Sequence, residues 1–368
     1  MKYVCTICHR SSPDGNLWCQ EPDCPAEEKP AVFGYGQHLG DIKVIRLLRL
    51  LRTSAIYEGE RDGQQVLLKV AHQGCENQLR REAEALRQLQ GGAKGRRVHP
   101  SLPTLLPAYS ASTTERHSYG KTIVERQTFY YEVLAFVDGV FLRDYLIENP
   151  QPWYEYVVWI ILGIGEVVQF LHQTLGRLHV FLSPEIVLLR TDEDGIPRPI
   201  LLDLGLLIQE TQDEHLHWLH YYGLPAYVPP ELTYSTPDTM SKTQQATAAS
   251  DVYGVAVMLY EMLAGHPLHE FTLQRDSEIR EAVRTHKPPA LMRRDLPDRV
   301  HTVIEQAISK NMQERYQDMR SFLQDLRLLF GNVPRERKRT SSDQRLLVAV
   351  TIGAIALTGL ILLAAWLG

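Results

Sequence analysis

The chain has 368 residues, 44% of them hydrophobic, which is enough for one large or two ordinary domains with a substantial core. The net charge of −5, from 39 Lys and Arg against 44 Asp and Glu, argues against a basic protein that binds polyanions over its whole surface. Four of the five cysteines lie in the first 24 residues, which is not the pattern of a disulfide framework spread through a secreted fold.

Two cysteine pairs open the chain: Cys5 and Cys8, with two residues between them, then Cys19 and Cys24, with four residues between them. Thiolate pairs on tight turns can converge on one tetrahedral zinc ion. Residues 1–30 bury too little apolar surface to fold alone, so the metal would supply much of their folding free energy. We therefore predict a small zinc module similar to zinc ribbons. Two disulfides are the alternative, which the cytoplasmic location inferred below disfavours.

Residues 31–40 contain three glycines and are predicted to be a linker. Beyond them, alternating apolar residues predict strands, and apolar residues at helical spacing predict helices. The expected strands are Ile42–Leu51, Ala55–Glu60 and Gln65–Val70, two more in 121–138, and a hairpin of Ile186–Leu189 and Ile200–Leu202; the expected helices are Glu76–Gln90, Phe141–Ile147 and Trp153–Leu175. The last helix is apolar, but its run Val157–Gly165 is too short to span a bilayer, so we expect it in the core.

Several motifs, in fitting order, resemble those of the protein kinase superfamily. The segment LHVFLSPEIVLL, which begins at Leu178, resembles the family's HRDLKPENILL, and Asp203-Leu204-Gly205 resembles its DFG motif. The resemblance implies an α+β, bilobal kinase-like domain at 41–330, with a small lobe at about 41–137 and a large lobe at about 138–330. It also implies a buried ion pair between Glu231 and Arg315.

The positions that perform phosphoryl transfer in this family are replaced here. Phe181 lies where the family has its catalytic Asp, Ser183 where it has a Lys, and Ile186 where it has a metal-binding Asn. The three glycines of the phosphate-binding loop correspond to Arg49, Leu51 and Ser54, whose side chains obstruct the approach of backbone N–H groups to phosphates. The resemblance therefore predicts a pseudokinase, although an acid such as Glu185 could rescue weak activity.

Other family positions are kept. Lys69 matches the nucleotide-binding Lys and Glu82 the helix Glu that pairs with it, while Asp203 matches the Asp of DFG. Ala135 and Val137 match the hinge whose backbone receives adenine. ATP with magnesium therefore remains an implied cofactor, beside the structural zinc.

The C-terminal part predicts a membrane anchor. Residues 346–367 contain no charge over 22 positions, and a helix of that length is about 33 Å long, enough for a hydrocarbon core of about 30 Å. The preceding linker, 331–345, is basic, which places the kinase-like domain in the cytoplasm. A buried core helix is the alternative. The layout resembles bacterial membrane-bound Ser/Thr kinases.

Together these features predict a membrane-tethered pseudokinase that acts as a scaffold or allosteric partner of other signalling proteins, among them an active kinase. An active Ser/Thr kinase with an atypical site is the alternative. Nucleic-acid binding through the zinc module is a weaker one, because residues 1–30 hold three basic residues against five acidic ones.

Overall fold

The computed structural model describes most of the chain up to Gly331. The described residues are 1–12, 19, 24, 29–91, 98–109, 117–192, 195–204, 223–233, 246–270, 274–297 and 299–331. They all belong to one compact unit, Met1–Asn332. The predicted transmembrane helix at 346–367 and, apart from Gly331, the predicted basic linker lie outside the described residues.

A seven-stranded antiparallel sheet forms the small lobe, in the order β4-β5-β6-β7-β10-β8, with β9 paired to β10. Its strands are β4 (His38–Leu39), β5 (Ile42–Leu50), β6 (Ser54–Arg61), β7 (Gln64–Ala71), β8 (Leu105–Leu106), β9 (Gly120–Val124) and β10 (Gln127–Ala135). Asp62 and Gly63 join β6 to β7 with φ of 51° and 74°, the left-handed pair that a tight hairpin turn requires. The three predicted strands at 42–70 are confirmed.

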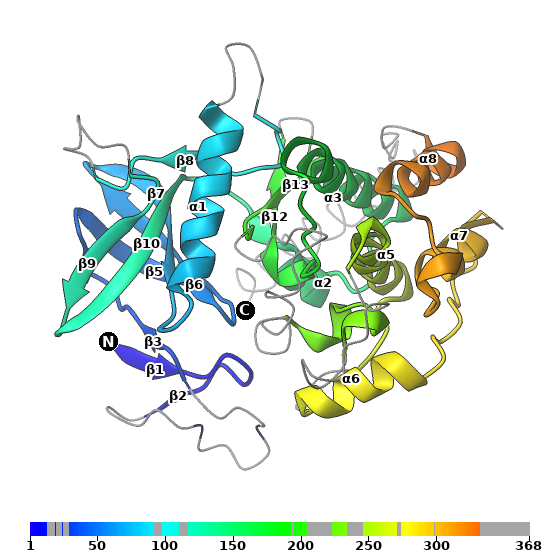
Figure 1. Ribbon diagram of the computed structural model, residues 1–368, viewed down its shortest axis with the longest axis horizontal. Coiled ribbons are helices and arrows are strands. Elements are labelled where there is room, and N and C mark those ends of the chain that lie inside the picture. The colour runs from blue at the N-terminus through cyan, green and yellow to red at the C-terminus, as the bar shows by residue number, and fades with distance from the viewer. Residues whose placement is uncertain are drawn as a thin grey trace, which may run out of the picture. The chain divides into compact units, whose positions relative to one another are not determined.

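Helix α1 (Glu76–Gly91) covers the sheet and contacts β7, β8 and β10 (Figure 1). Its buried face includes Leu79, Ala83 and Leu86, at the spacing of one helix face, and also Glu82. The predicted helix at Glu76–Gln90 is therefore confirmed, and the apolar stripe that indicated it carries one acid into the core.

The expectation of a linker at residues 31–40 is wrong. Strand β3 (Ala31–Val32) pairs with β1 (Lys2–Val4), which also pairs with β2 (Ser11–Ser12), and β4 joins the main sheet. Phe33 is buried and packs edge-on against Tyr57 and Phe129. Aromatic partners far along the chain thus order a segment whose glycines predicted flexibility.

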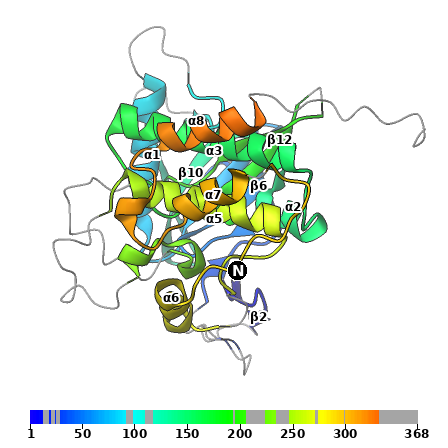
Figure 2. The same ribbon diagram turned by 90° about the vertical axis from the view of Figure 1, so that its right-hand side faces the viewer.

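The large lobe is built around α3, against which α5 and α8 pack (Figure 2). Strand β13 also packs against α3 (Figure 1). Its elements are β11 (Val140–Phe141), α2 (Leu142–Glu148), α3 (Tyr154–Leu175), β12 (Val187–Thr191), β13 (Pro197–Leu201), α5 (Ala248–Ala264), α6 (Asp276–Thr285), α7 (Arg299–Ala307) and α8 (Met319–Phe330). Among the described helices, α3 alone is long and apolar enough to cross a bilayer, but 56% of its most apolar window is buried inside the protein. It is the core helix that the sequence predicted.

Candidate active site

The four N-terminal cysteines converge in space. Their Sγ atoms all lie within 4.8 Å of one another, with Cys5 to Cys24 at 3.7 Å and Cys8 to Cys19 at 3.6 Å. A disulfide would need about 2.05 Å, whereas zinc bonds of about 2.3 Å to the corners of a tetrahedron separate the sulfurs by about 3.8 Å. The N–H groups of Ile7 and Cys8 point at the Cys5 sulfur, at 3.3 and 3.5 Å. The cluster is compatible with a zinc module.

Asp251, in the first turn of α5, holds the loop that follows α3. Its carboxylate accepts hydrogen bonds from the backbone N–H groups of His179, at 2.8 Å, and Val180, at 2.6 Å. The buried His179 ring in turn donates from Nε2 to the carbonyl oxygen of Asp203, at 2.6 Å. Val180 has a φ of 55°, which is strained for a β-branched residue and persists because these bonds fix the loop.

Phe181, at the position of the expected catalytic Asp, is 8% exposed and packs with Leu178, Val228 and Leu232. Its ring lies directly on the backbone of Gly223: a Cβ there would be 2.8 Å from the ring carbons. A large apolar group therefore fills the place where a general base would meet its substrate.

The neighbouring positions differ from the family motif as well. Ser183 is buried, and Ile186 belongs to the large hydrophobic core. Glu185 is ion-paired through one carboxylate oxygen to Arg143, at 2.8 Å, and through the other to Arg49, at 3.0 Å. Both oxygens of this acid are thus held by guanidinium groups.

Lys69 and Glu82 form a buried ion pair, and the Lys69 ammonium also lies 3.1 Å from an oxygen of Asp203. A third contact runs to the carbonyl oxygen of Leu202, at 3.4 Å. Burial alone would lower the pKa of Lys69, but the neighbouring carboxylates outweigh it and hold that pKa above its ordinary value. The sequence placed these three side chains correctly relative to one another.

Glu132 is a fourth titratable residue of this cluster, which the sequence analysis missed. It lies opposite Lys69 in the β7–β10 ladder and is 0% exposed. Neither of its carboxylate oxygens has a hydrogen-bond partner among the described residues. Burial, reinforced by the charge of Glu82, raises the pKa of this carboxyl well above its ordinary value. A lone acid in the apolar strand Phe129–Ala135 was the available signal.

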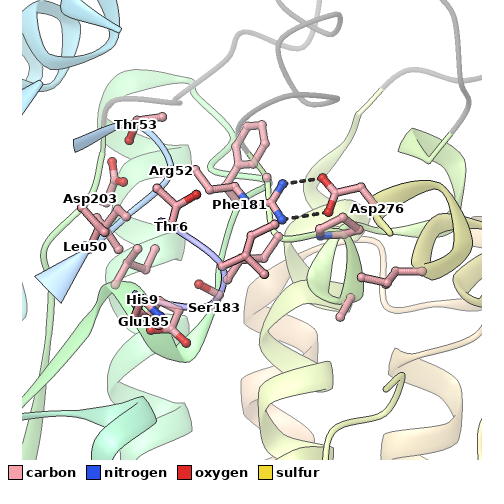
Figure 3. A pocket seen from close by; sticks show the side chains of 18 of the residues that line it. Thr6, His9, Leu50, Arg52, Thr53, Phe181, Ser183, Glu185, Asp203 and Asp276 are labelled. Atoms are coloured by element: carbon pink, nitrogen blue, oxygen red, sulfur yellow. Dashed lines mark hydrogen bonds and ion pairs between the residues drawn. The ribbon is translucent and has the colours of Figure 1, made fainter. Parts of the chain in front are cut away.

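The β5–β6 hairpin, where the glycine-rich loop was expected, is tied to the large lobe. Arg49 pairs with Asp144 as well as with Glu185. Arg52 forms a bidentate pair with Asp276 at the start of α6, with one N–O distance of 2.9 Å (Figure 3). The hairpin therefore bridges the two lobes by ion pairs.

The remaining hairpin positions point inward. Leu51 is 7% exposed and belongs to the same hydrophobic cluster as Leu134 of β10 and Leu188 of β12. Ser54 is buried, and its hydroxyl lacks a hydrogen-bond partner within the part of the chain that the structure describes. Leu51 also lines a cavity in the cleft, beside Leu50 and Arg52.

Comparison with known proteins identifies the family. Residues 66–326, more than half of the chain, match the protein kinase domain. The chain belongs to the protein kinase family. The match begins inside β7, after the hairpin that would carry a kinase's glycine-rich loop.

The similar kinases are bacterial. The serine/threonine-protein kinase PkaA of Streptomyces coelicolor is 29% identical over 184 residues, which are 50% of this chain and 31% of PkaA. The serine/threonine-protein kinase PknB of Mycobacterium tuberculosis is 26% identical over 223 residues, 58% of this chain and 32% of PknB. The chain thus spans about a third of the length of the curated kinases it matches.

A crystal structure of the Mycobacterium tuberculosis PknI kinase domain superposes with a TM-score of 0.54 at 18% identity. The similarity covers 82% of this chain and all of the PknI kinase domain. At this identity the likeness concerns the fold, and it confirms the predicted bilobal kinase fold.

The predicted hinge residues lie on the segment between the two lobes. Ala135 ends β10 and Val137 follows, on the segment that leads to β11 of the other lobe. The N–H of Ala135 donates to the carbonyl oxygen of Thr104, at 2.8 Å. Both hinge residues are half-buried.

Protein kinases hold ATP with a phosphate-covering loop and with magnesium bound to an Asp and an Asn. Asp203 keeps such a carboxylate in the cleft, but Ile186 offers no oxygen, and Arg49 and Leu51 occupy the loop positions. The residues present supply one magnesium ligand and do not fit the complete Mg–ATP site.

Proposed function

We propose that this kinase-family chain is a regulatory, membrane-tethered pseudokinase with little or no phosphoryl transfer of its own. The observation that carries the proposal is the Phe181 ring, packed on Gly223 where the catalytic base would lie. A positioned base contributes about 10²–10⁴-fold to a rate. Kinases turn over at about 1–100 per second, so loss of the base alone leaves roughly 1 to 10⁻⁴ per second.

Glu185 does not replace the lost base. Its two oxygens are engaged by Arg49 and Arg143, and the Arg143 guanidinium is also bound to Glu261, at 2.5 Å. Each oxygen of this carboxylate already accepts a charge-assisted hydrogen bond from a guanidinium group. This network supports a structural role for Glu185, in joining the hairpin to the large lobe.

The contacts of the β5–β6 hairpin also argue against tight nucleotide binding. A loop that cradles phosphates needs backbone N–H groups that can approach them closely. Here Arg49 and Arg52 are committed to carboxylates of the large lobe, and Leu51 is buried in the core between the lobes. We infer that these ion pairs hold the hairpin against the large lobe without a nucleotide beneath it.

The alternative, an active Ser/Thr kinase with an atypical site, is favoured by one observation: Lys69, Glu82 and Asp203 are together in the cleft. In this arrangement, however, the Lys69 ammonium is shared among the two carboxylates and the Leu202 carbonyl. An incoming triphosphate would therefore compete with the carboxylates of Glu82 and Asp203 for the Lys69 ammonium.

The partners and location follow from the rest of the chain. The uncharged segment 346–367 and the basic residues of 331–345 support one membrane-spanning helix with the kinase fold in the cytoplasm. Each of the same basic residues favours binding to anionic lipid by about 1 kcal/mol near the membrane surface.

A kinase fold that does not transfer phosphate acts by binding other proteins. We therefore propose signalling proteins at the membrane, among them an active kinase, as its partners. The Cys5–Cys24 cluster supports one structural zinc.

The proposal predicts that ATP, with magnesium or manganese, leaves the melting temperature of the full-length protein unchanged. A nucleotide at a hundredfold excess over its dissociation constant would stabilise by about 2.7 kcal/mol. For a kinase domain of about 290 residues that is a rise of about 4 °C. A rise of that size, abolished by Lys69→Met and kept by the exposed control Lys287→Met, would favour the active-kinase alternative.

A further inference from the structure

The turn that carries the first cysteine pair, Cys5–His9, which we call the knuckle, is fixed to the small lobe on one side. It follows β1, which pairs with β2 and β3, and the N–H of Val4 donates to the carbonyl oxygen of Pro30, at 3.1 Å. Val4 also packs on the buried core that contains Phe33. The knuckle therefore moves with the small lobe.

On its other side the knuckle faces the large lobe across the cleft. A cavity of about 210 Å³ is lined by Thr6, Ile7 and His9 together with residues from the rest of the cleft. Those residues include Phe181, Ser183, Glu185 and Asp203 at the former catalytic centre, Leu50–Thr53 of the hairpin, Gly223–Ala226, and Asp276 and Ile279 of α6. Figure 3 shows Thr6 and His9 among the hairpin and large-lobe side chains. The knuckle is thus one wall of the residual active-site cavity.

The shape of the knuckle depends on its sulfur cluster. Cys5 is buried, its sulfur receives the N–H groups of Ile7 and Cys8, and its carbonyl oxygen receives the N–H of His9. His9 itself has a φ of 56°, a left-handed conformation that a non-glycine residue keeps only when its surroundings fix it. Since so short a segment gains much of its folding free energy from metal, loss of metal would release the knuckle.

We propose that the knuckle is a metal-dependent cap on the interlobe cleft. With metal on Cys5, Cys8, Cys19 and Cys24, Thr6, Ile7 and His9 wall off the Phe181–Ile186 loop and Gly223–Ala226 from solvent. Without metal the cap opens, and the cleft becomes accessible to a ligand or partner. The cap concerns access to the cleft, so it goes beyond the proposed function and holds whether or not phosphoryl transfer occurs.

Hydrogen exchange of the full-length protein, followed by mass spectrometry, tests the cap without any measure of activity. Removing zinc with a chelator should speed the exchange of peptides covering Phe181–Ile186 and Gly223–Ala226 by tenfold or more. Peptides from α5 and from β12 should exchange at unchanged rates, because they pack in the large-lobe core away from the knuckle. Unchanged rates at the cleft after complete zinc removal would overturn the proposal.

A variant that disturbs the contact and keeps the ligands separates capping from general loosening. Ile7→Asp places a charge in the cavity wall and should accelerate exchange at the same cleft peptides while one zinc per chain stays bound. Ser11→Asp puts the same charge on an exposed position of β2 and should have no effect. Thr6→Asp replaces Ile7→Asp if that protein loses its zinc. If Ile7→Asp or Thr6→Asp keeps its zinc and its cleft peptides exchange at the wild-type rate, the proposal is overturned. This holds even if the chelator speeds exchange in the wild type.

Discussion

Arg315→Ala is expected to lower the free energy of unfolding by about 3–5 kcal/mol, because it strands the partner carboxylate of a buried ion pair. The Arg315 side chain is 0% exposed and donates two hydrogen bonds to Glu231, at 2.9 and 2.7 Å. A further bond, at 2.6 Å, runs to the carbonyl oxygen of Ser309. The pair that the kinase resemblance implied is therefore present, and urea denaturation of the variant measures its removal.

The matched control is Arg327→Ala. Arg327 pairs with Glu166 at 2.6 Å, but both side chains are substantially exposed. Exposed pairs contribute about 0–1 kcal/mol, so the control should lose no more than that. Equal losses in the two variants would mean that burial does not govern the strength of these ion pairs.

Glu132→Leu is expected to stabilise the protein, by about 1–3 kcal/mol at pH 7, because it removes a buried carboxyl group whose oxygens accept no hydrogen bond from the described residues. The difference in unfolding free energy between the variant and the wild type should increase with pH. The folded-state pKa of Glu132 is raised above its ordinary value, so wild-type stability is intact below about pH 4.5 and is lost as the pH rises through the raised pKa. The free energies of unfolding of the wild type and the variant, measured from about pH 4.5 to about pH 9, test this pH dependence.

Glu82→Leu is the control for that cluster. Glu82 is equally buried, but it binds the Lys69 ammonium and accepts a hydrogen bond from the N–H of Leu204, at 2.9 Å. Its removal should destabilise by about 1–3 kcal/mol, since these donors lose their acceptor. If Glu132→Leu destabilised the protein as much as Glu82→Leu, the Glu132 carboxyl would stabilise the folded state through the ion-pair network. That result would contradict the prediction.

The sequence predicted the kinase fold through local patterns that survive into the structure. The alternation in 42–70 became β5, β6 and β7, and the apolar stripe of 76–90 became the buried face of α1. The family motifs identified Lys69 in β7, Glu82 in α1 and Asp203 just after β13, three residues that the structure brings together. These features depend on neighbours in the chain, and a sequence displays them directly.

What the sequence did not reveal depends on distant partners. The linker prediction failed because the burial of Phe33 requires Tyr57 and Phe129. The bidentate ion pair between Arg52 and Asp276 joins residues more than two hundred positions apart, so no sequence spacing predicts it. The contact of the knuckle with the cleft likewise arises only when both lobes and the cysteine cluster are assembled.

The measurement that tests the pseudokinase proposal most directly is transfer of labelled phosphate from ATP by the full-length protein, to itself and to peptides containing Ser and Thr. With the base lost at Phe181, a metal ligand lost at Ile186 and the phosphate loop replaced, we predict a rate of no more than about 10⁻⁴ per second. This rate should be the same in Lys69→Met. A faster transfer, abolished by Lys69→Met and retained by Lys287→Met, would contradict the proposal and show an active kinase.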